Sequence, residues 1–258
     1  MTNIKNNIKN NGGAASEPKV IYENENFVAV NKPAGLLVHA AHAESGEPTL
    51  VDWLSARYPE IRSVGDDPKN RPGIVHRLDK DTSGVILVAR NQDYFDYLKG
   101  LFQKREIQKT YLVLLSGRLK EARGVIEKPI GLKPGTVKRT TKTDRAKLVK
   151  EAVTEYLVKA RLEYDDPDTA EKEKTPYSLV QAFPKTGRTH QIRIHFASLG
   201  TPVAGDKLYG QKRDPLNLPG QFLHAESVEF SLKSGSRIKI SADLPDDLAE
   251  VLAKLKKV

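Results

Sequence analysis

The 258-residue sequence contains no cysteine and only one methionine and one tryptophan. Without cysteine the chain cannot form disulfides, thiolate zinc sites or a thiol nucleophile, and this composition is compatible with a reducing, cytoplasmic compartment. No apolar run approaches the length of a membrane span, so we expect no membrane partner. Residues 1–18 are polar and rich in asparagine, without the hydrophobic centre of a secretory signal, and predict a disordered tail before a folded region over 19–258.

The charge that is present is mostly positive. The chain has 42 lysines and arginines against 33 acids, which gives a formal net charge of +9 and a pI of about 9.5. Such an excess favours an anionic partner, and nucleic acid is favoured over a lipid surface because no amphipathic membrane helix stands out. A basic surface without a ligand is the alternative that composition leaves open.

Two polar segments read as insertions. Residues 133–150 carry seven basic residues and a single acid, Asp144, which is too polar for a core. They predict either a loop along an RNA backbone, with Lys138 and Arg139 as candidate RNA contacts, or a solvated connector. Residues 165–174 are acidic and mixed, and predict a hairpin tip that faces away from any RNA.

The apolar patterns predict an α+β fold, because strands and helices do not alternate regularly along the chain. Capped amphipathic segments predict helices at 49–58, from Asn91 onward, at 189–199 and at 247–256. Alternating apolar residues predict strands at 20–22, 27–30, 109–115, 153–158 and 178–183. This order favours a mainly antiparallel sheet over a doubly wound one.

The densest charge lies between Pro72 and Gly84, where five charged or titratable residues fall within six positions. A core strand or a simple turn does not require this density. A carboxylate clustered with arginine and lysine is typical of a group held ionised beside an anionic substrate. Asp79 is therefore the strongest catalytic candidate, and Arg77 points the same way if the backbone is extended.

A second cluster lies between Thr186 and His195. If a helix begins near residue 189, Arg188 lies at its amino end and Arg193 about one turn inside, where it could pair with a distant carboxylate such as Asp79. His190 and His195 would lie roughly 140° apart on that helix, which makes them poor joint metal ligands. The HExxH pattern is also absent, so we expect no metal site, and we expect His195 to be a hydrogen-bonded core residue.

These runs, with three shorter blocks, resemble the RluA family of pseudouridine synthases. The five blocks occur in the order of the family and span roughly residues 20–245: Asn31–Leu36, His76–Gly84, Lys109–Tyr111, Gly187–Arg193 and Gly205–Gly210. The longer form from Arg71 is most similar to the large-subunit ribosomal RNA branch. Many larger relatives carry an amino-terminal S4-type module that is not seen here, so we expect the catalytic domain, residues 19–258, to select the substrate.

The resemblance implies the pseudouridine synthase catalytic fold, with a mixed, mainly antiparallel sheet in two subdomains and flanking helices. It implies a ribosomal RNA or tRNA partner, no metal, no cofactor and a monomeric enzyme. In the implied reaction, a uridine is detached at its N1–C1′ bond, the uracil turns, and C5 bonds to C1′.

Roles follow from the resemblance position by position. Asp79 matches the catalytic aspartate, Tyr111 the tyrosine that packs on the uracil, and Arg193 the arginine that pairs with the aspartate. Arg77 matches the residue that fills the space left by the displaced uridine, although a phosphate contact would need the same side chain. Arg188 is expected to contact phosphate or the fold. Whether the aspartate attacks the sugar, attacks the uracil or removes the C2′ proton stays open.

Two other classes of function fit parts of the sequence. Asp79 and Asp81 with Ser83 are similar to the nucleophile motif of magnesium-dependent phosphatases, but His76 and Arg77 interrupt the apolar strand that this motif needs. An RNA-binding protein without catalysis would account for the charge. It would leave the combination of Asp79 with a tyrosine and an arginine unexplained.

Overall fold

The computed structural model of the chain describes residues 17–40, 46–166 and 174–258. The tail expected over 1–18 lies almost wholly outside these ranges, as does the tip of the hairpin expected at 165–174. The strands that lead into and out of that tip do pair, with Lys174 opposite Asp165. Within the described ranges, no helix is long and apolar enough to cross a membrane.

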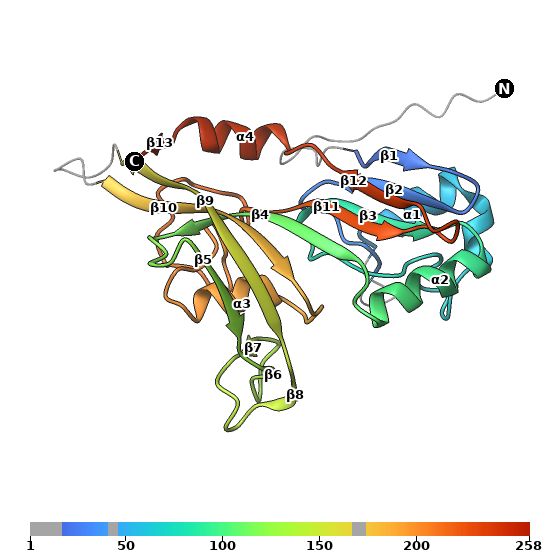
Figure 1. The fold of residues 1–258 in the computed structure, drawn as a ribbon, viewed down its shortest axis with the longest axis horizontal. Helices are drawn as coiled ribbons and strands as arrows, with labels where there is room; N and C mark the ends of the chain where they lie inside the picture. The colour runs from blue at the N-terminus through green and yellow to red at the C-terminus, as the bar shows by residue number, and fades with distance from the viewer. Residues whose placement is uncertain (1–16, 41–45, 167–173) are drawn as a thin grey trace.

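One ten-stranded sheet runs through the whole molecule (Figure 1). Its main path is β1 (Lys19–Glu23), β2 (Phe27–Lys32), β3 (Ser83–Ala89), β11 (Leu223–Ser231), β4 (Gln108–Ser116), β10 (Lys174–Pro184), β9 (Val153–Asp165) and β13 (Lys256–Lys257). Off this path, β12 (Arg237–Ser241) pairs with β11, and β5 (Arg123–Glu127) pairs with β9. Only β3 and β11 pair in parallel among the described strands, so the expected mixed, mainly antiparallel sheet is confirmed.

The amino-terminal half of the sheet is covered on both faces. Helix α1 (Leu50–Arg57) packs its buried leucines on one face of β2 and β3, followed by the 3-10 helix η1 (Pro59–Ser63). Helix α2 (Gln92–Gln103) covers the other face with its aromatic stripe. Both caps expected from the sequence are confirmed: the side chain of Thr49 accepts the Asp52 N–H, and that of Asn91 accepts the Tyr94 N–H.

The other half is built on β4, β10 and β9. Helix α3 (Gln191–Ala197) packs Ile192 and Phe196 on one face, and helix α4 (Asp246–Ala253) packs Leu248 and Val251 on the other. Figure 1 shows the two halves side by side, with β4 and β11 where they meet. This arrangement agrees with the expected two subdomains and leaves the end of each half free to contribute to a site between them.

A second, small sheet projects from the carboxyl-terminal half (Figure 1). It contains β6 (Ile130–Leu132), β7 (Arg139–Thr140) and β8 (Lys147–Lys150), in the order β7-β6-β8. The prediction of a loop over 133–150 is therefore wrong in part, because two short strands lie within it. Their side chains are mostly exposed, so the polar composition reflects solvent contact rather than the lack of a sheet.

Two predicted helices are shorter in the structure. Helix α3 begins at Gln191 because His190 has left-handed backbone angles, φ 56° and ψ 22°, which no helix continues. Helix α4 ends at Ala253, and residues 256–257 instead pair with the free edge of β9. Strands β3 and β11 were not predicted. Strand β3 is buried along its whole length and therefore lacks the alternation that identifies a strand.

Candidate active site

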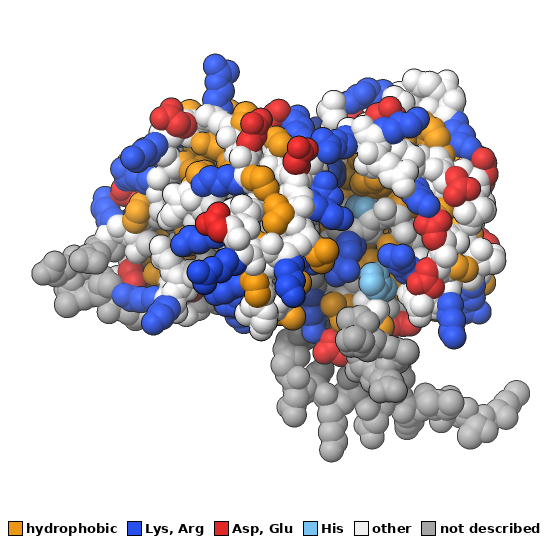
Figure 2. Space-filling view, turned by 90° about the horizontal axis from the view of Figure 1, so that it is seen from below, with side chains coloured by type: hydrophobic (Ala, Val, Ile, Leu, Met, Phe, Trp, Pro, Cys, Tyr) orange, Lys and Arg blue, Asp and Glu red, His pale blue; other side chains and the backbone are white. Residues whose placement is uncertain are grey.

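A cavity of about 490 Å³ opens between the two halves of the sheet. Figure 2 shows this hollow from below, with lysine and arginine side chains gathered around it. Three segments line it, Val75–Thr82, Phe102–Tyr111 and Pro184–Arg193, so the fold brings three of the five sequence blocks together. Asp79 is the one acid among the described residues that line it; the lining cations are Arg77, Arg105, Lys109, Lys185, Arg188 and Arg193.

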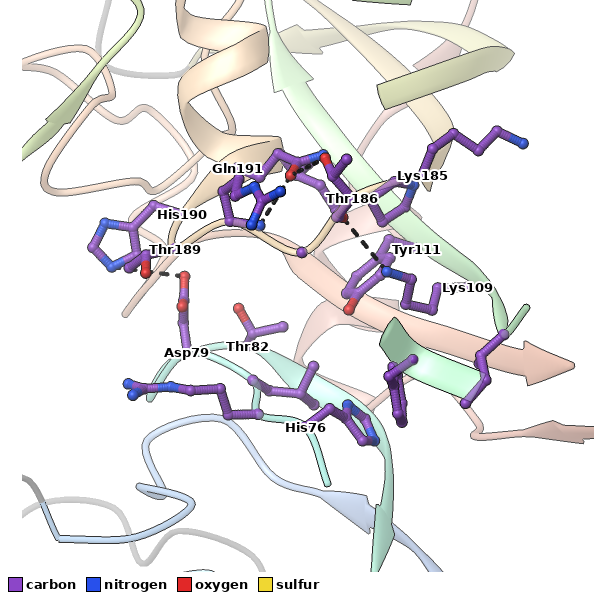
Figure 3. A pocket seen from close by; sticks show the side chains of 18 of the residues that line it. His76, Asp79, Thr82, Lys109, Tyr111, Lys185, Thr186, Thr189, His190 and Gln191 are labelled. Carbon is purple, nitrogen blue, oxygen red and sulfur yellow. Dashed lines mark hydrogen bonds and ion pairs between the residues drawn. The ribbon is translucent and has the colours of Figure 1, made fainter. Parts of the chain in front are cut away.

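Asp79 lies in the connection that leads into β3, where its carbonyl accepts the Thr82 N–H at 3.1 Å and closes a turn. Its carboxylate is 21% exposed, and Oδ2 accepts a hydrogen bond from Arg193 Nη1 at 3.0 Å. His190 Nε2 lies 4.0 Å from the same oxygen, as Figure 3 shows. The contact expected between Asp79 and Arg193 is therefore present, although 114 residues separate the two in the chain.

Arg193 is held by a second carboxylate that the sequence reasoning missed. Its Nε and Nη2 donate to the two oxygens of Asp206, at 2.7 and 2.8 Å, while the ring of Tyr209 lies 5.4 Å from its guanidinium carbon. Burial alone would lower the pKa of Arg193, but Asp206 and Asp79 outweigh it and raise that pKa above its ordinary value. The two-point contact fixes the guanidinium in one plane, charged, with Nη1 left for Asp79.

Asp206 is itself buried and bound by backbone N–H groups. It is 3% exposed, and its Oδ1 also accepts the N–H groups of Leu208 and Tyr209 at 2.9 and 3.0 Å. Burial would raise its pKa, but Arg193 and these N–H groups lower it below the usual range. The block Gly205–Gly210, in which an aspartate begins a turn, is the sequence feature that could have identified Asp206.

Tyr111 comes from β4, and its side chain faces the same opening as Asp79 (Figure 3). Burial, and then the negative charge of Asp79, raise the pKa of its hydroxyl above the ordinary value. The phenol therefore stays protonated at neutral pH, and it offers a flat ring and a hydrogen-bond donor rather than a base.

The four residues expected to bind RNA occupy two regions. Arg77 and Arg188 line the cavity, and Arg188 Nε donates to the carbonyl of Glu151 at 2.9 Å. The backbone N–H of Arg188 donates to the Gln191 side chain. Arg139 lies in β7 of the small sheet, Lys138 directly precedes it, and neither lines the cavity.

The small sheet is nevertheless tied to the site. The backbone N–H of Arg139 donates to the Tyr209 hydroxyl at 2.9 Å, and that hydroxyl lies 3.0 Å from His190 Nδ1. Burial lowers the pKa of His190, and the charge of Asp79 offsets this only in part. A neutral imidazole at this point connects Tyr209 to the neighbourhood of Asp79.

The other histidine of this segment has a structural role. His195 is fully buried, with Nδ1 at 2.9 Å from Thr154 Oγ1 and Nε2 at 3.0 Å from the Lys128 carbonyl. This confirms the expectation of a hydrogen-bonded core histidine. Among the described residues, no group of three His, Cys, Asp or Glu side chains is placed to hold a metal ion.

Lys32, from the block Asn31–Leu36, binds the backbone of the turn that carries Asp79. Its side chain is buried, and Nζ donates to the carbonyls of Pro33, Leu36 and Lys80 at 2.8, 2.8 and 2.9 Å. Burial lowers its pKa to about 7, against the opposing charges of Asp81 and Asp79. Because Lys80 follows Asp79, this bond anchors the turn that carries the carboxylate.

Comparisons with known proteins agree with this geometry. A family model described as RNA pseudouridylate synthase matches residues 26–198. An uncharacterized RNA pseudouridine synthase of Chloroflexus aurantiacus is 42% identical over 229 residues, 88% of this chain and 66% of that protein. The ribosomal large subunit pseudouridine synthase D of Nitrosomonas europaea is 34% identical over 249 residues, 93% of this chain and 66% of that protein.

The chain thus spans slightly less than two thirds of the length of these two relatives. Among solved structures, human RNA pseudouridylate synthase domain containing 1 has a TM-score of 0.75 at 25% identity, with 96% of this chain and 91% of that one covered. The shared fold, the matched length and the cavity formed by the blocks lead to one conclusion: the chain belongs to the RNA pseudouridylate synthase family.

Proposed function

We propose that the chain is an RNA pseudouridine synthase in which Asp79 is the catalytic carboxylate. One observation carries this proposal: Asp79 is the one acid among the described residues lining the cavity, and Arg193, itself fixed by Asp206, holds it in place. A cavity of about 490 Å³ falls in the range of ligand pockets and admits a nucleoside that has left the RNA stack.

The placement of these groups supports the following reaction. As the N1–C1′ bond of a uridine breaks, positive charge develops at C1′, and the Asp79 carboxylate stabilises or traps it. The uracil turns within the cavity against the ring of Tyr111, and C5 then bonds to C1′. C5 loses its proton and N1 gains one, so the product is an isomer of the substrate.

The fold fixes Asp79 before the substrate arrives. Arg193 cannot rotate freely because Asp206 binds its Nε and Nη2, and Lys32 holds the carbonyl beside Asp79. A carboxylate oriented in advance needs no reorganisation during bond breaking, which is the main source of electrostatic catalysis.

We further propose ribosomal RNA as the substrate, in line with the name of the Nitrosomonas relative, and tRNA as the alternative outcome of the test. Arg77 would fill the gap left by the displaced uridine, and Arg188, Lys138 and Arg139 would contact backbone phosphates. The protein would act in the cytoplasm as a monomer, with residues 19–258 as its catalytic domain. The cysteine-free composition is compatible with that location.

An Asp79→Asn variant tests the proposal, because it removes the charge and keeps the shape of the side chain. Cellular RNA from a strain lacking the gene is incubated with each protein in the presence of EDTA, and pseudouridine is mapped at single-nucleotide resolution. We expect new pseudouridine sites with the wild type. At these sites Asp79→Asn should convert uridine at least about a thousandfold more slowly, in line with losing a nucleophile or an electrostatic stabiliser.

Asp96→Asn is the matched control, since Asp96 is an exposed carboxylate of α2 that does not line the cavity. This variant should retain wild-type activity. If the wild type makes no new site while both proteins bind RNA equally, the chain is an RNA-binding protein without catalysis. The mapped nucleotides also decide between ribosomal RNA and tRNA.

A further inference from the structure

One end of the cavity carries cations that have no acidic partner. Lys109 of β4 and Arg105, which follows α2, both line it. In the described part of the chain, neither has a carboxylate oxygen within 4.0 Å, whereas Lys185 pairs with Glu155 at 2.8 Å. Among the described residues, the ammonium of Lys109 donates only to the Thr186 carbonyl, at a long 3.5 Å. Two neighbouring like charges are therefore left without compensation.

This arrangement is unfavourable for the protein alone. Lys109 is half-buried, and burial together with the charge of Arg105 lowers its pKa to about 8. A desolvated cation without a counter-charge costs folding free energy. Such groups cluster at functional sites, where a ligand supplies the missing interaction.

His76 adds a neutral donor at the same end. Its Nε2 lies 2.8 Å from the backbone nitrogen of Leu87, and a backbone N–H can only donate. Nε2 must then hold the lone pair, so Nδ1 carries the hydrogen. Burial and the charge of Lys109 lower the pKa of His76 to about 3, so the ring is neutral at neutral pH and the bond from Leu87 selects its tautomer. The ring is held against Phe102, with centroids 4.5 Å apart.

Figure 3 shows His76 and Lys109 on the side of the opening away from Asp79. At the Asp79 end the one carboxylate among the described lining residues is paired with the guanidinium of Arg193, which Asp206 also binds, so this guanidinium is fully compensated. The other end offers Lys109, Arg105 and the Nδ1–H of His76. The two ends of the cavity therefore differ: the charges at the Asp79 end are paired, and the cations at the other end are left to bind an anion.

We propose that Lys109, Arg105 and His76 form an anion subsite that takes a backbone phosphodiester of the RNA strand whose uridine occupies the cavity. This inference rests on RNA being the ligand of the proposed function. A phosphodiester is the anion that every RNA strand carries beside each nucleoside, and lysine, arginine and N–H donors are its usual partners. Binding at this end would fix the direction in which the strand crosses the cavity.

A two-by-two binding experiment tests the subsite. Wild type and Lys109→Gln are titrated into a labelled oligouridylate and into the same oligomer with uncharged methylphosphonate linkages. A homopolymer is used because it presents uridine and a linkage in every register. We expect Lys109→Gln to bind the charged oligomer about tenfold more weakly, the usual loss for a hydrogen bond to a charged group, and the uncharged oligomer as well as the wild type does.

Three further measurements complete the design. Lys109→Arg should restore binding of the charged oligomer, and Lys239→Gln, an exposed lysine of β12 outside the cavity lining, should behave as wild type with both oligomers. The slope of log affinity against log salt should be smaller by about 0.7 for Lys109→Gln, one phosphate contact on a single strand. Its melting temperature should not fall, because an uncompensated charge is removed.

Loss of affinity for both oligomers to the same extent, together with a lower melting temperature, would mean that Lys109 supports the fold, and the subsite would be wrong. Equal binding of the charged oligomer by wild type and Lys109→Gln would overturn it as well. Because the result is read from binding, a protein that makes no pseudouridine would contradict the proposed function without deciding this experiment.

Discussion

At the scale of single residues, the site depends on Arg193 and on how differently its two carboxylates are placed. The side chain of Asp206 is completely buried and binds two nitrogens of the guanidinium. Asp79 is 21% exposed and binds only Nη1. Asp206 therefore acts as the structural partner that positions Arg193, and Asp79 remains accessible to a substrate.

This difference predicts that the two aspartates contribute unequally to the free energy of unfolding. Asp206→Asn should lower the free energy of unfolding by about 3 kcal/mol, because it leaves the buried guanidinium with only the partly exposed Asp79 as a compensating charge. Asp79→Asn should change it by less than about 1 kcal/mol, since Arg193 keeps Asp206 and the site is partly hydrated. Urea unfolding of both variants measures this, and equal losses would contradict the assignment of roles.

At the scale of elements, the parallel pair of β3 and β11 joins the turn of Asp79 to the centre of the sheet. Ser83 begins this pairing opposite His224, and Gly84 follows opposite Ala225, with φ at 114°. A Cβ at this position would lie 2.2 Å from the Ala225 carbonyl oxygen, which is closer than any real contact. The block His76–Gly84 therefore ends in glycine because the neighbouring backbone leaves no room for a side chain.

Gly84→Ala should consequently destabilise the protein by more than about 3 kcal/mol, as the close approach and the positive φ both have to change. Gly100→Ala is the matched control, because Gly100 lies within α2 with nothing within 4 Å of its added Cβ. It should stabilise by about 0.5 to 1 kcal/mol through helix propensity. Thermal unfolding of the two variants checks both signs, and similar melting temperatures would contradict the argument.

At the scale of the whole molecule, the two halves of the sheet surround one basic hollow (Figure 2), and the small sheet of β6, β7 and β8 lies outside its lining. The small sheet carries exposed cations and is tied to the site by the bond from Arg139 N–H to Tyr209. An RNA that enters the cavity can therefore reach both at once.

Replacing Lys138 and Arg139 together by glutamine should weaken RNA binding and reduce the salt slope by about 0.7 for each lost phosphate contact. The melting temperature should stay unchanged, because the Arg139 backbone bond to Tyr209 is preserved and the side chain of Lys138 is exposed. Anisotropy titrations with ribosomal RNA fragments at several salt concentrations measure this. Unchanged affinity would identify the segment as a solvated connector.

Local sequence patterns predicted what depends on neighbours in the chain. The caps at Thr49 and Asn91 were predicted correctly because a cap needs only residues three positions apart. The start of α3 was not, since His190 takes left-handed backbone angles and its ring contacts the distant Tyr209, which local spacing does not indicate. Strand β3 was missed because a buried strand shows no alternation.

The sequence by itself determined the chemical inventory: a basic, cysteine-free chain with Asp79, Tyr111 and Arg193 in blocks that resemble one family. It also indicated that Asp79 pairs with a distant arginine. Only the tertiary structure decided that Asp206 holds that arginine, and that Lys109 and Arg105 stand without an acidic partner. The physical reason is that charge compensation depends on distances of a few ångströms between segments far apart in the chain, and the packing of those segments in the fold sets the distances.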